Sequence, residues 1–172
     1  MGRMAADATT LTPEHPFLLE VHGALDRVYG DRLVALAIFG SVARRSARPD
    51  SDLDLLVVVR GLPRGHRARL ATFDPVERSL ADSLGALRTA GVQTSLSPVL
   101  RTPEDMQTAS PLMLDLTEDA VIIVDHGDVL RAALDDLRAR LRRLGSRRIW
   151  TGPGAWYWDL KPDYKRGEIF EL

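Results

Sequence analysis

Two apolar segments separated by a short polar turn constrain this chain more than any other feature. The first, residues 33–39, reads LVALAIF, and the second, residues 53–59, reads LDLLVVV. Short runs rich in Val, Ile and Leu and bounded by turn residues are typical of buried β-strands. We therefore predict two strands of one sheet, joined by a turn that contains Gly40, Ser41 and several arginines.

Asp52 and Asp54 open the second strand, one residue apart. Because side chains alternate between the faces of a strand, both carboxylates point the same way, whereas Leu53 and Leu55 point the other way. Two neighbouring carboxylates without a partner repel each other, and one would then be protonated. A divalent cation between them explains the pair best. The alternative is two solvated residues at the start of a strand.

Gly40 and Ser41 follow the first strand at a point where a helix could begin. Backbone N–H groups in a first helical turn lack intrahelical partners and, together with a serine hydroxyl, suit phosphate oxygens. With the two carboxylates, this corner predicts a site for a metal-bound nucleoside triphosphate. A turn merely capped by Ser41 is the alternative interpretation.

Gly40-Ser41, ten intervening residues and Asp52-x-Asp54 resemble the signature of the DNA polymerase β-like nucleotidyltransferase superfamily, particularly its minimal nucleotidyltransferase branch. The resemblance implies an α/β fold: a mixed, largely antiparallel sheet of four or more strands with helices packed mainly on one face. It also implies Mg²⁺ as cofactor, held by Asp52 and Asp54 as metal-binding and catalytic residues. The residues that it would place at the nucleotide are Gly40, Ser41, Arg44 and Ser51. For Arg44, a solubilising loop charge is the alternative to a clamp on the triphosphate.

A third strand is predicted within residues 92–100, VQTSLSPVL, where polar and apolar residues alternate. Nucleotidyltransferases that this chain resembles generally place a third acidic residue here, but this sequence offers Ser95 or Ser97. A serine hydroxyl is a weak metal ligand and no base near neutral pH. Three explanations are open. Another acid enters the site from elsewhere, with Glu104 or Asp105 the nearest in sequence; or catalysis is slow; or the site binds nucleotide without turnover.

The remaining pattern is helical, apart from one further strand. Apolar spacing and capping residues predict helices over 13–29, over 66–90 with a break near Asp74-Pro75, from Ser110-Pro111 onward, and over 130–144, where Gly145 ends the helix. The run at 121–124 predicts a fourth strand. We expect three parts: a disordered N-terminus (1–11), a nucleotidyltransferase domain (12–146) and an aromatic-rich C-terminal strap packed on it (147–172).

Composition excludes several classes of protein. The 172 residues are 45% hydrophobic and 27% charged, as in an ordinary globular domain. No apolar run is long enough to span a membrane, and the polar start is no signal peptide. The chain has no cysteine, which fits a cytoplasmic location, and its four histidines lack the spacing of a zinc site.

Two segments can each be interpreted in two ways. Seven arginines lie between Arg131 and Arg148, either on the solvated back of a helix or as a contact for RNA or phosphate. The tail 147–172 holds all three tryptophans, and it forms either the packed strap or a surface for base stacking or protein docking. Because the net charge is only −1, nucleic acid is the less favoured partner.

Two functions remain in view at this stage. The first is Mg²⁺-dependent transfer of a nucleoside monophosphate, AMP from ATP, to an acceptor hydroxyl, with a partner protein as the favoured acceptor. The second follows from the resemblance to minimal nucleotidyltransferases, which are often antitoxins of HEPN-type ribonuclease toxins. The chain would then neutralise such a toxin by binding, with weak or no catalysis because the third acid is missing.

Overall fold

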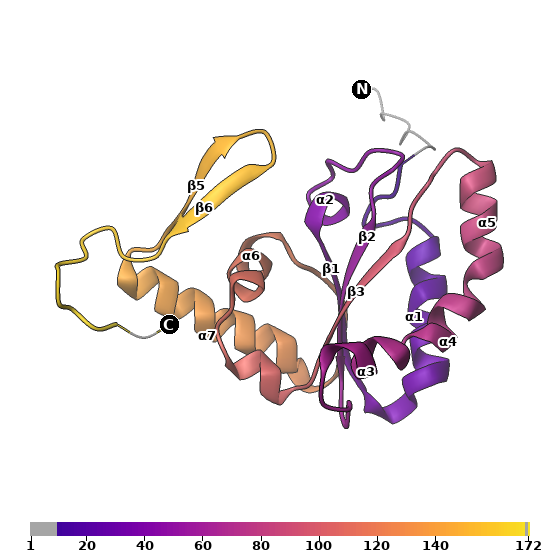
Figure 1. Cartoon of the computed structure of the whole chain (residues 1–172), viewed down its shortest axis with the longest axis horizontal. Helices are drawn as coiled ribbons and strands as arrows, with labels where there is room; N and C mark the ends of the chain where they lie inside the picture. The colour runs from indigo at the N-terminus through magenta and orange to yellow at the C-terminus, as the bar shows by residue number, and fades with distance from the viewer. Residues whose placement is uncertain (1–9, 171) are drawn as a thin grey trace.

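The computed structural model describes residues 10–170 and 172. A four-stranded mixed sheet forms the centre of the molecule (Figure 1). The strand order is β3-β2-β1-β4. β1 pairs antiparallel with both β2 and β4, and β2 pairs parallel with β3. The predicted mixed, largely antiparallel α/β fold is therefore confirmed. The strands are β1 (Leu33–Phe39), β2 (Leu53–Val59), β3 (Leu96–Arg101) and β4 (Val121–Asp125).

Helices cover both faces of this sheet, so the expectation of helices mainly on one face is wrong (Figure 1). The physical reason is already visible in LVALAIF, which is apolar at every position and therefore buries both of its faces. One face carries α1 (Phe17–Tyr29), α3 (His66–Ala71), α4 (Asp74–Ser79) and α5 (Ala81–Thr89). The other carries α6 (Pro111–Asp119) and α7 (Val129–Leu144).

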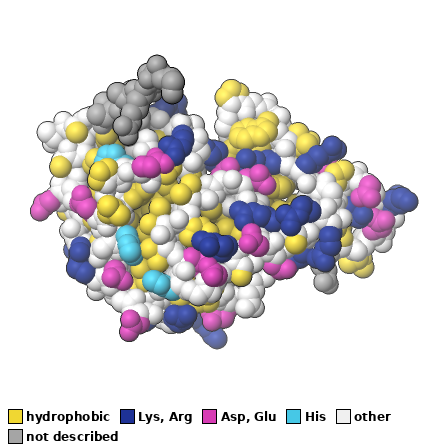
Figure 2. All heavy atoms as spheres, turned by 180° about the vertical axis from the view of Figure 1, so that it is seen from behind, with side chains coloured by type: hydrophobic (Ala, Val, Ile, Leu, Met, Phe, Trp, Pro, Cys, Tyr) yellow, Lys and Arg dark blue, Asp and Glu magenta, His cyan; other side chains and the backbone are white. Residues whose placement is uncertain are grey.

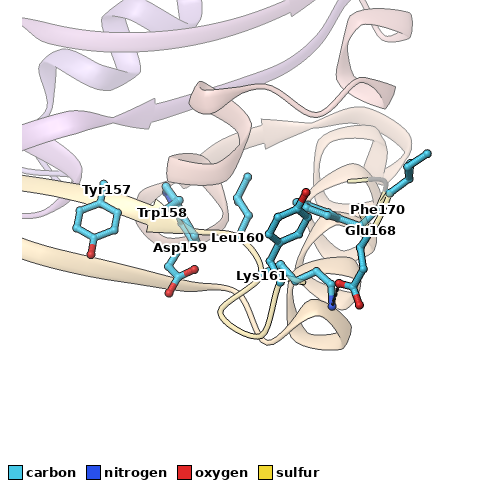
Figure 3. Close-up of a pocket in the computed structure, with 9 residues that line it drawn as sticks. Tyr157, Trp158, Asp159, Leu160, Lys161, Glu168 and Phe170 are labelled. Atoms are coloured by element: carbon cyan, nitrogen blue, oxygen red, sulfur yellow. Dashed lines mark ion pairs between the residues drawn. The ribbon is translucent and has the colours of Figure 1, made fainter. Parts of the chain in front are cut away.

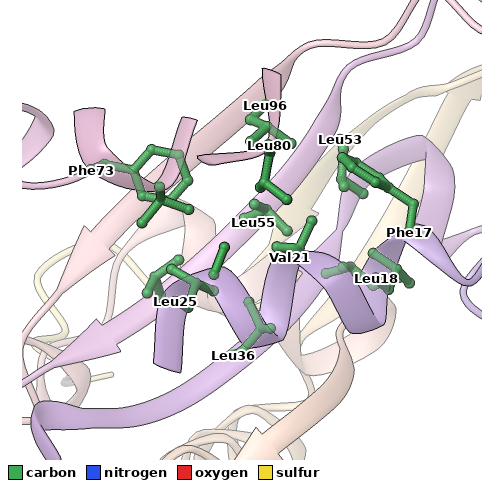
Figure 4. Packing of buried hydrophobic residues seen from close by; sticks show 14 of the residues in the cluster. Phe17, Leu18, Val21, Leu25, Leu36, Leu53, Leu55, Phe73, Leu80 and Leu96 are labelled. Carbon is green, nitrogen blue, oxygen red and sulfur yellow. The ribbon is translucent and has the colours of Figure 1, made fainter. Parts of the chain in front are cut away.

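The two hydrophobic cores assign a side to each residue of β2. Leu53 and Leu55 pack with α1 and α4, as the close-up of this core shows (Figure 4). Leu56 and Val58 pack instead with α6 and α7. Because side chains alternate along a strand, Asp54 lies on the α6 and α7 side. Asp54 of β2 therefore lies on the side of the sheet that the C-terminal third of the chain covers.

The helix boundaries differ from prediction at the N-terminus. The first helix begins at Phe17 rather than Pro13, because Pro16 disfavours the helical conformation at the residue before it. The region 66–90 breaks twice, before Asp74 and at Leu80, into three short helices. At the other end, Gly145 caps α7 in the left-handed conformation (φ 68°), as predicted. The expected disorder of residues 1–11 falls mostly on residues 1–9, which lie outside the described part.

A two-stranded hairpin, β5 (Arg147–Gly152) and β6 (Ala155–Asp159), follows α7 and stands apart from the main sheet (Figure 1). The sequence interpretation did not predict these strands. Trp150 faces Trp156 across the ladder, and the two rings are 5.0 Å apart between centroids. Aromatic cross-strand pairs of this kind stabilise hairpins.

Short helical turns complete the described part of the chain: η1 (Gly30–Arg32), α2 (Gly40–Ala43), η2 (Glu104–Gln107) and η3 (His126–Asp128). Among residues 10–170, no helix combines the length and the hydrophobicity that crossing a membrane requires.

Candidate nucleotide-binding site

Gly40, Asp52 and Asp54 lie where β1 ends and β2 begins, and we call this place the acidic corner. It is tightly packed. Gly40 follows β1 and begins α2, while Asp54 pairs with Phe39, the last residue of β1. A Cβ atom on Gly40 would lie 2.0 Å from Oδ2 of Asp54, and the glycine has a φ of +69°. Glycine is therefore required here both by its backbone conformation and by the carboxylate beside it. The structure brings together the two halves of the motif.

The carboxyl group of Asp54 is partly withdrawn from water. Burial raises its pKa above the ordinary value of 3.8, and the charge of Asp52 raises it further. A hydrogen bond with Ser97 and the charge of Arg44 act in the opposite direction. Asp52 is exposed. The ionised pair is therefore electrostatically unfavourable without a further positive charge, which is the condition that favours cation binding.

Both candidate serines of the third strand lie beside the acids. Ser95, just before β3, donates a hydrogen bond of 2.5 Å from its hydroxyl to Oδ1 of Asp52. Ser97 pairs in register with Asp54 across the parallel ladder. Ser97 therefore occupies the position from which a side chain on β3 reaches the half-buried Asp54.

The acids nearest in sequence to β3 cannot replace the missing one. β2 and β3 are parallel, so Asp54 lies at the start of β3, whereas Glu104 follows its end. From Ser97 to Arg101 alone, the strand extends about 13 Å. Asp105 is paired with Arg69 at 2.5 Å. Glu104 and Asp105 therefore do not supply the third acid, and the described residues contain no cluster of three or more acidic or histidine side chains suited to a metal ion.

The predicted nucleotide-binding residues occupy different local environments. Ser51 closes the turn before the acids: its hydroxyl accepts a hydrogen bond of 2.9 Å from the backbone N–H of Arg48. Ser41 follows Gly40 in α2 and is partly exposed. Arg44 caps the C-terminus of the same short helix. The nucleotide-binding roles of these residues stay predictions.

Arg44 is held by residues that the sequence interpretation did not include. Its Nη1 donates to Oδ2 of Asp119, at the end of α6, over 3.0 Å, and its guanidinium lies 4.9 Å from the ring centroid of Trp156. Arg148 on β5 donates to both oxygens of the same carboxylate, over 2.8 and 3.1 Å. These residues are far apart in the sequence, and only the packing of the hairpin brings them together.

Asp115, one turn earlier on α6, anchors the hairpin as well. Its Oδ1 accepts hydrogen bonds from the indole N–H groups of Trp156 and Trp158, over 2.7 and 2.9 Å. No sequence motif singles out Asp115. Two neighbouring acids of α6 thus attach the aromatic tail to the domain.

A pocket of about 620 Å³ lies away from the acidic corner, at the base of the hairpin (Figure 3). Lys161 within it is paired with Asp163 at 3.0 Å and with Glu168 at 3.3 Å. None of the predicted site residues lines this pocket, so it does not bear on the acidic pair. Its lining consists of Tyr157, Trp158, Asp159, Leu160, Lys161, Tyr164, Glu168, Ile169 and Phe170.

The arginine-rich segment after Arg131 is largely neutralised by acids. Five of its seven arginines, 131, 138, 140, 147 and 148, form ion pairs with aspartates within the described residues. The face shown in Figure 2 likewise mixes basic and acidic side chains rather than presenting a continuous basic surface. This pairing favours the solvated-helix interpretation over an RNA contact.

The mixed sheet, the glycine corner and the acids one residue apart define the class of nucleotidyltransferases. A family model described as a nucleotidyltransferase domain matches residues 22–127, more than half of the chain. The chain belongs to this family, and the superfamily resemblance drawn from the motif is confirmed.

Individual relatives are more distant. A protein of Methanocaldococcus jannaschii named "Putative protein adenylyltransferase" is 27% identical over 118 residues, which cover 67% of this chain and 75% of the relative. A crystal structure described as a toxin–antitoxin with AMP-PNP aligns at 14% identity and a TM-score of 0.45, covering 74% of this chain and 91% of that one. A mutant of the toxin–antitoxin MntA-HpeT aligns at 13% identity and a TM-score of 0.48, covering 73% and 87%. With TM-scores below 0.5, these two structures carry no weight for function.

Proposed function

We propose that this protein is a Mg²⁺-dependent nucleotidyltransferase of the cytoplasm that transfers AMP from ATP to a hydroxyl group of a partner protein. The observation that carries the proposal is the contact between Gly40 and Asp54 beside Asp52, within a chain of the nucleotidyltransferase family. A protein acceptor is supported by the name of the Methanocaldococcus jannaschii relative. The lack of cysteine in the chain is consistent with the cytoplasm.

The donor set at the corner fits Mg²⁺. Mg²⁺ prefers oxygen ligands and is commonly held by one or two carboxylates together with substrate phosphates and water. Asp52 and Asp54 provide the two carboxylates, and because burial raises the pKa of Asp54, a nearby positive charge would favour its ionised form. When bound, the ion would neutralise charge on the phosphates during transfer.

The residues of the chain supply mainly binding and orientation. Gly40 leaves room for the acid, Ser41 offers a hydroxyl to the triphosphate, and Arg44 offers a positive charge to its phosphates. In the reaction, the acceptor oxygen bonds to the α-phosphorus while the bond to the α,β-bridging oxygen breaks. Pyrophosphate leaves, and the proton of the acceptor hydroxyl passes to solvent water.

Transfer by this site should be slow. Ser97 lies where a carboxylate on β3 could accept the proton of the acceptor, and a serine hydroxyl is no base near neutral pH. A positioned general base typically contributes about 10²- to 10⁴-fold to such a step. The site therefore retains charge stabilisation and positioning but lacks one accelerating group.

Intact-mass spectrometry tests the proposal. The purified protein is incubated with Mg²⁺, ATP and the product of the neighbouring gene, and the mass of that product should increase by one AMP. The Asp52→Asn/Asp54→Asn variant is the control and should leave it unmodified. If the partner also stays unmodified after long incubation with the wild-type protein, transfer is contradicted.

A second function is favoured by Ser97 in place of an acid: binding of a HEPN-type ribonuclease toxin without modification. Under this alternative, the chain neutralises the toxin by complex formation. Co-expression distinguishes the two. Protection by Asp52→Asn/Asp54→Asn equal to that by wild type, with no added AMP, supports binding alone, whereas loss of protection supports transfer.

A further inference from the structure

One buried carboxylate, that of Asp119, connects α2 to the C-terminal hairpin. The side chain of Asp119 is only 7% exposed and accepts from two arginines of different elements. Arg148, on β5, takes both of its oxygens, over 2.8 and 3.1 Å. Arg44, at the end of α2, reaches one of them over 3.0 Å. Asp119 therefore fixes the position of Arg44 relative to the hairpin.

Trp156 holds the two arginines from a second side. The guanidinium carbon of Arg44 lies 4.9 Å and that of Arg148 5.0 Å from the centroid of its ring. The indole is anchored in turn, because its N–H donates to Asp115 over 2.7 Å. Cations at this distance from an aromatic ring are attracted by its electron density. Arg44 is thus restrained by an ion pair and by a ring.

This restraint leaves Arg44 available for a ligand. A guanidinium has five N–H donors, and the contact with Asp119 uses Nη1. Arg44 lies four residues after Gly40, and its charge acts on the carboxyl group of Asp54 in lowering the pKa. A restrained arginine loses less conformational freedom on binding phosphate than a free one. The arrangement is that of a preorganised cation beside the acidic corner.

We propose that Asp119, Arg148 and Trp156 are positioning residues that hold Arg44 as the clamp for the triphosphate, which makes the C-terminal hairpin part of the nucleotide site. This inference rests on the proposed function. The family match ends at residue 127, so the hairpin residues Arg148 and Trp156 lie outside the part of the chain that the family model describes.

A double-mutant cycle on the affinity for Mg²⁺-ATP tests the inference. Isothermal titration calorimetry is performed on wild type, Arg44→Ala, Trp156→Leu and the double variant. Trp156→Leu should weaken binding about five- to tenfold, because Arg44 loses its restraint. In the Arg44→Ala background, the same substitution should change affinity less than about twofold, because residues that act through one partner are not additive.

Two hairpin variants serve as matched controls. Tyr157 follows Trp156 on β6 and has a side chain that is 55% exposed, so Tyr157→Leu should leave the affinity within about twofold. Trp156→Phe keeps the aromatic face but loses the N–H donor to Asp115, and it should bind more tightly than Trp156→Leu. A general loosening of the hairpin would instead weaken binding equally in Tyr157→Leu and Trp156→Leu.

A second cycle uses Asp119→Asn with Arg44→Ala and decides the matter if Trp156→Leu does not fold. Weakened binding by Asp119→Asn that disappears in the Arg44→Ala background supports the clamp. The inference is overturned if Asp119→Asn binds Mg²⁺-ATP as tightly as the wild type, or if it weakens binding just as much in the Arg44→Ala background. Either result leaves the proposed function intact. Failure of the wild type to bind Mg²⁺-ATP overturns both.

Discussion

Gly40 and Asp54 are so close that a single added methyl group at the glycine would overlap the carboxylate, with 2.0 Å between the Cβ position and Oδ2. The contact ties the end of β1 to the start of β2 and fixes the acid against the turn. A motif residue that might be taken for a simple turn glycine thus determines where a charged side chain can lie.

Gly40→Ala should destabilise the protein and abolish nucleotide binding. A φ of +69° costs an alanine about 1–2 kcal/mol, and displacing Asp54 adds about 1–3 kcal/mol. Urea denaturation measures the first effect, and titration with Mg²⁺-ATP the second. Gly61→Ala is the matched control, since Gly61 has a φ of +68° with nothing within 4 Å of the added Cβ. It should lose only the conformational part and bind ATP normally.

Asp54→Asn should stabilise the protein at neutral pH when no divalent ion is present. The folded pKa of Asp54 lies above the ordinary 3.8, so the folded state holds this proton more tightly than the unfolded chain. The contribution of Asp54 to stability is therefore largest below pH 3.8 and falls as the pH rises through the folded pKa. Removing the charge should raise the Tm by about 1–3 °C at pH 7.5.

Added Mg²⁺ should reverse this order, raising the Tm of the wild type but not that of Asp54→Asn. Asp50→Asn is the control: its side chain is 76% exposed in the same turn, and it should match the wild type in both conditions. A wild type whose Tm is indifferent to Mg²⁺ would contradict a cation site at these acids.

Ser97→Asp should increase the rate of AMP transfer by at least about tenfold, because it places a carboxylate beside Asp54 in the register of β3. The same variant should be less stable than the wild type without Mg²⁺, since three carboxylates then share one corner. Ser95→Asp, two residues earlier and beside the exposed Asp52, tests the position. An equal gain from both variants would show that the register does not matter. Transfer is followed by label incorporation from α-labelled ATP.

The arginine-rich segment 131–148 should not retain RNA at physiological salt, because ion pairs with aspartates already engage five of its seven arginines. Filter binding at increasing salt measures this. Retention that falls steeply with salt and is lost in Arg142→Ala/Arg143→Ala would show instead that the two remaining arginines form a nucleic-acid surface.

The core of the fold and the acidic corner were predictable because they depend on local rules. An uninterrupted apolar run indicates a buried strand, and acids one residue apart must share its face. The same run, LVALAIF, should also have predicted helices on both sides of the sheet. The position of Ser97 beside Asp54 required the parallel register of β2 and β3, which no local pattern specifies.

The hairpin and its contacts could not be predicted in the same way. Its strands carry exposed and half-buried residues without a regular alternation, so the period-two signal is weak. Asp119, Arg148 and Trp156 acquire a common role only through long-range packing against α6 and α2. The late start of α1 has a different, local cause, because the restriction that Pro16 imposes on the residue before it outweighed the pattern that predicted a helix from residue 13.

All three tryptophans of the chain, 150, 156 and 158, lie on the β5–β6 hairpin, and two of them donate to the single carboxylate of Asp115. Light absorbed at 295 nm is therefore absorbed by this hairpin and by nothing else in the protein. Its fluorescence provides a built-in optical signal for the docking of the tail, so that loosening on heating, or on addition of ATP or a partner, can be followed without an attached dye.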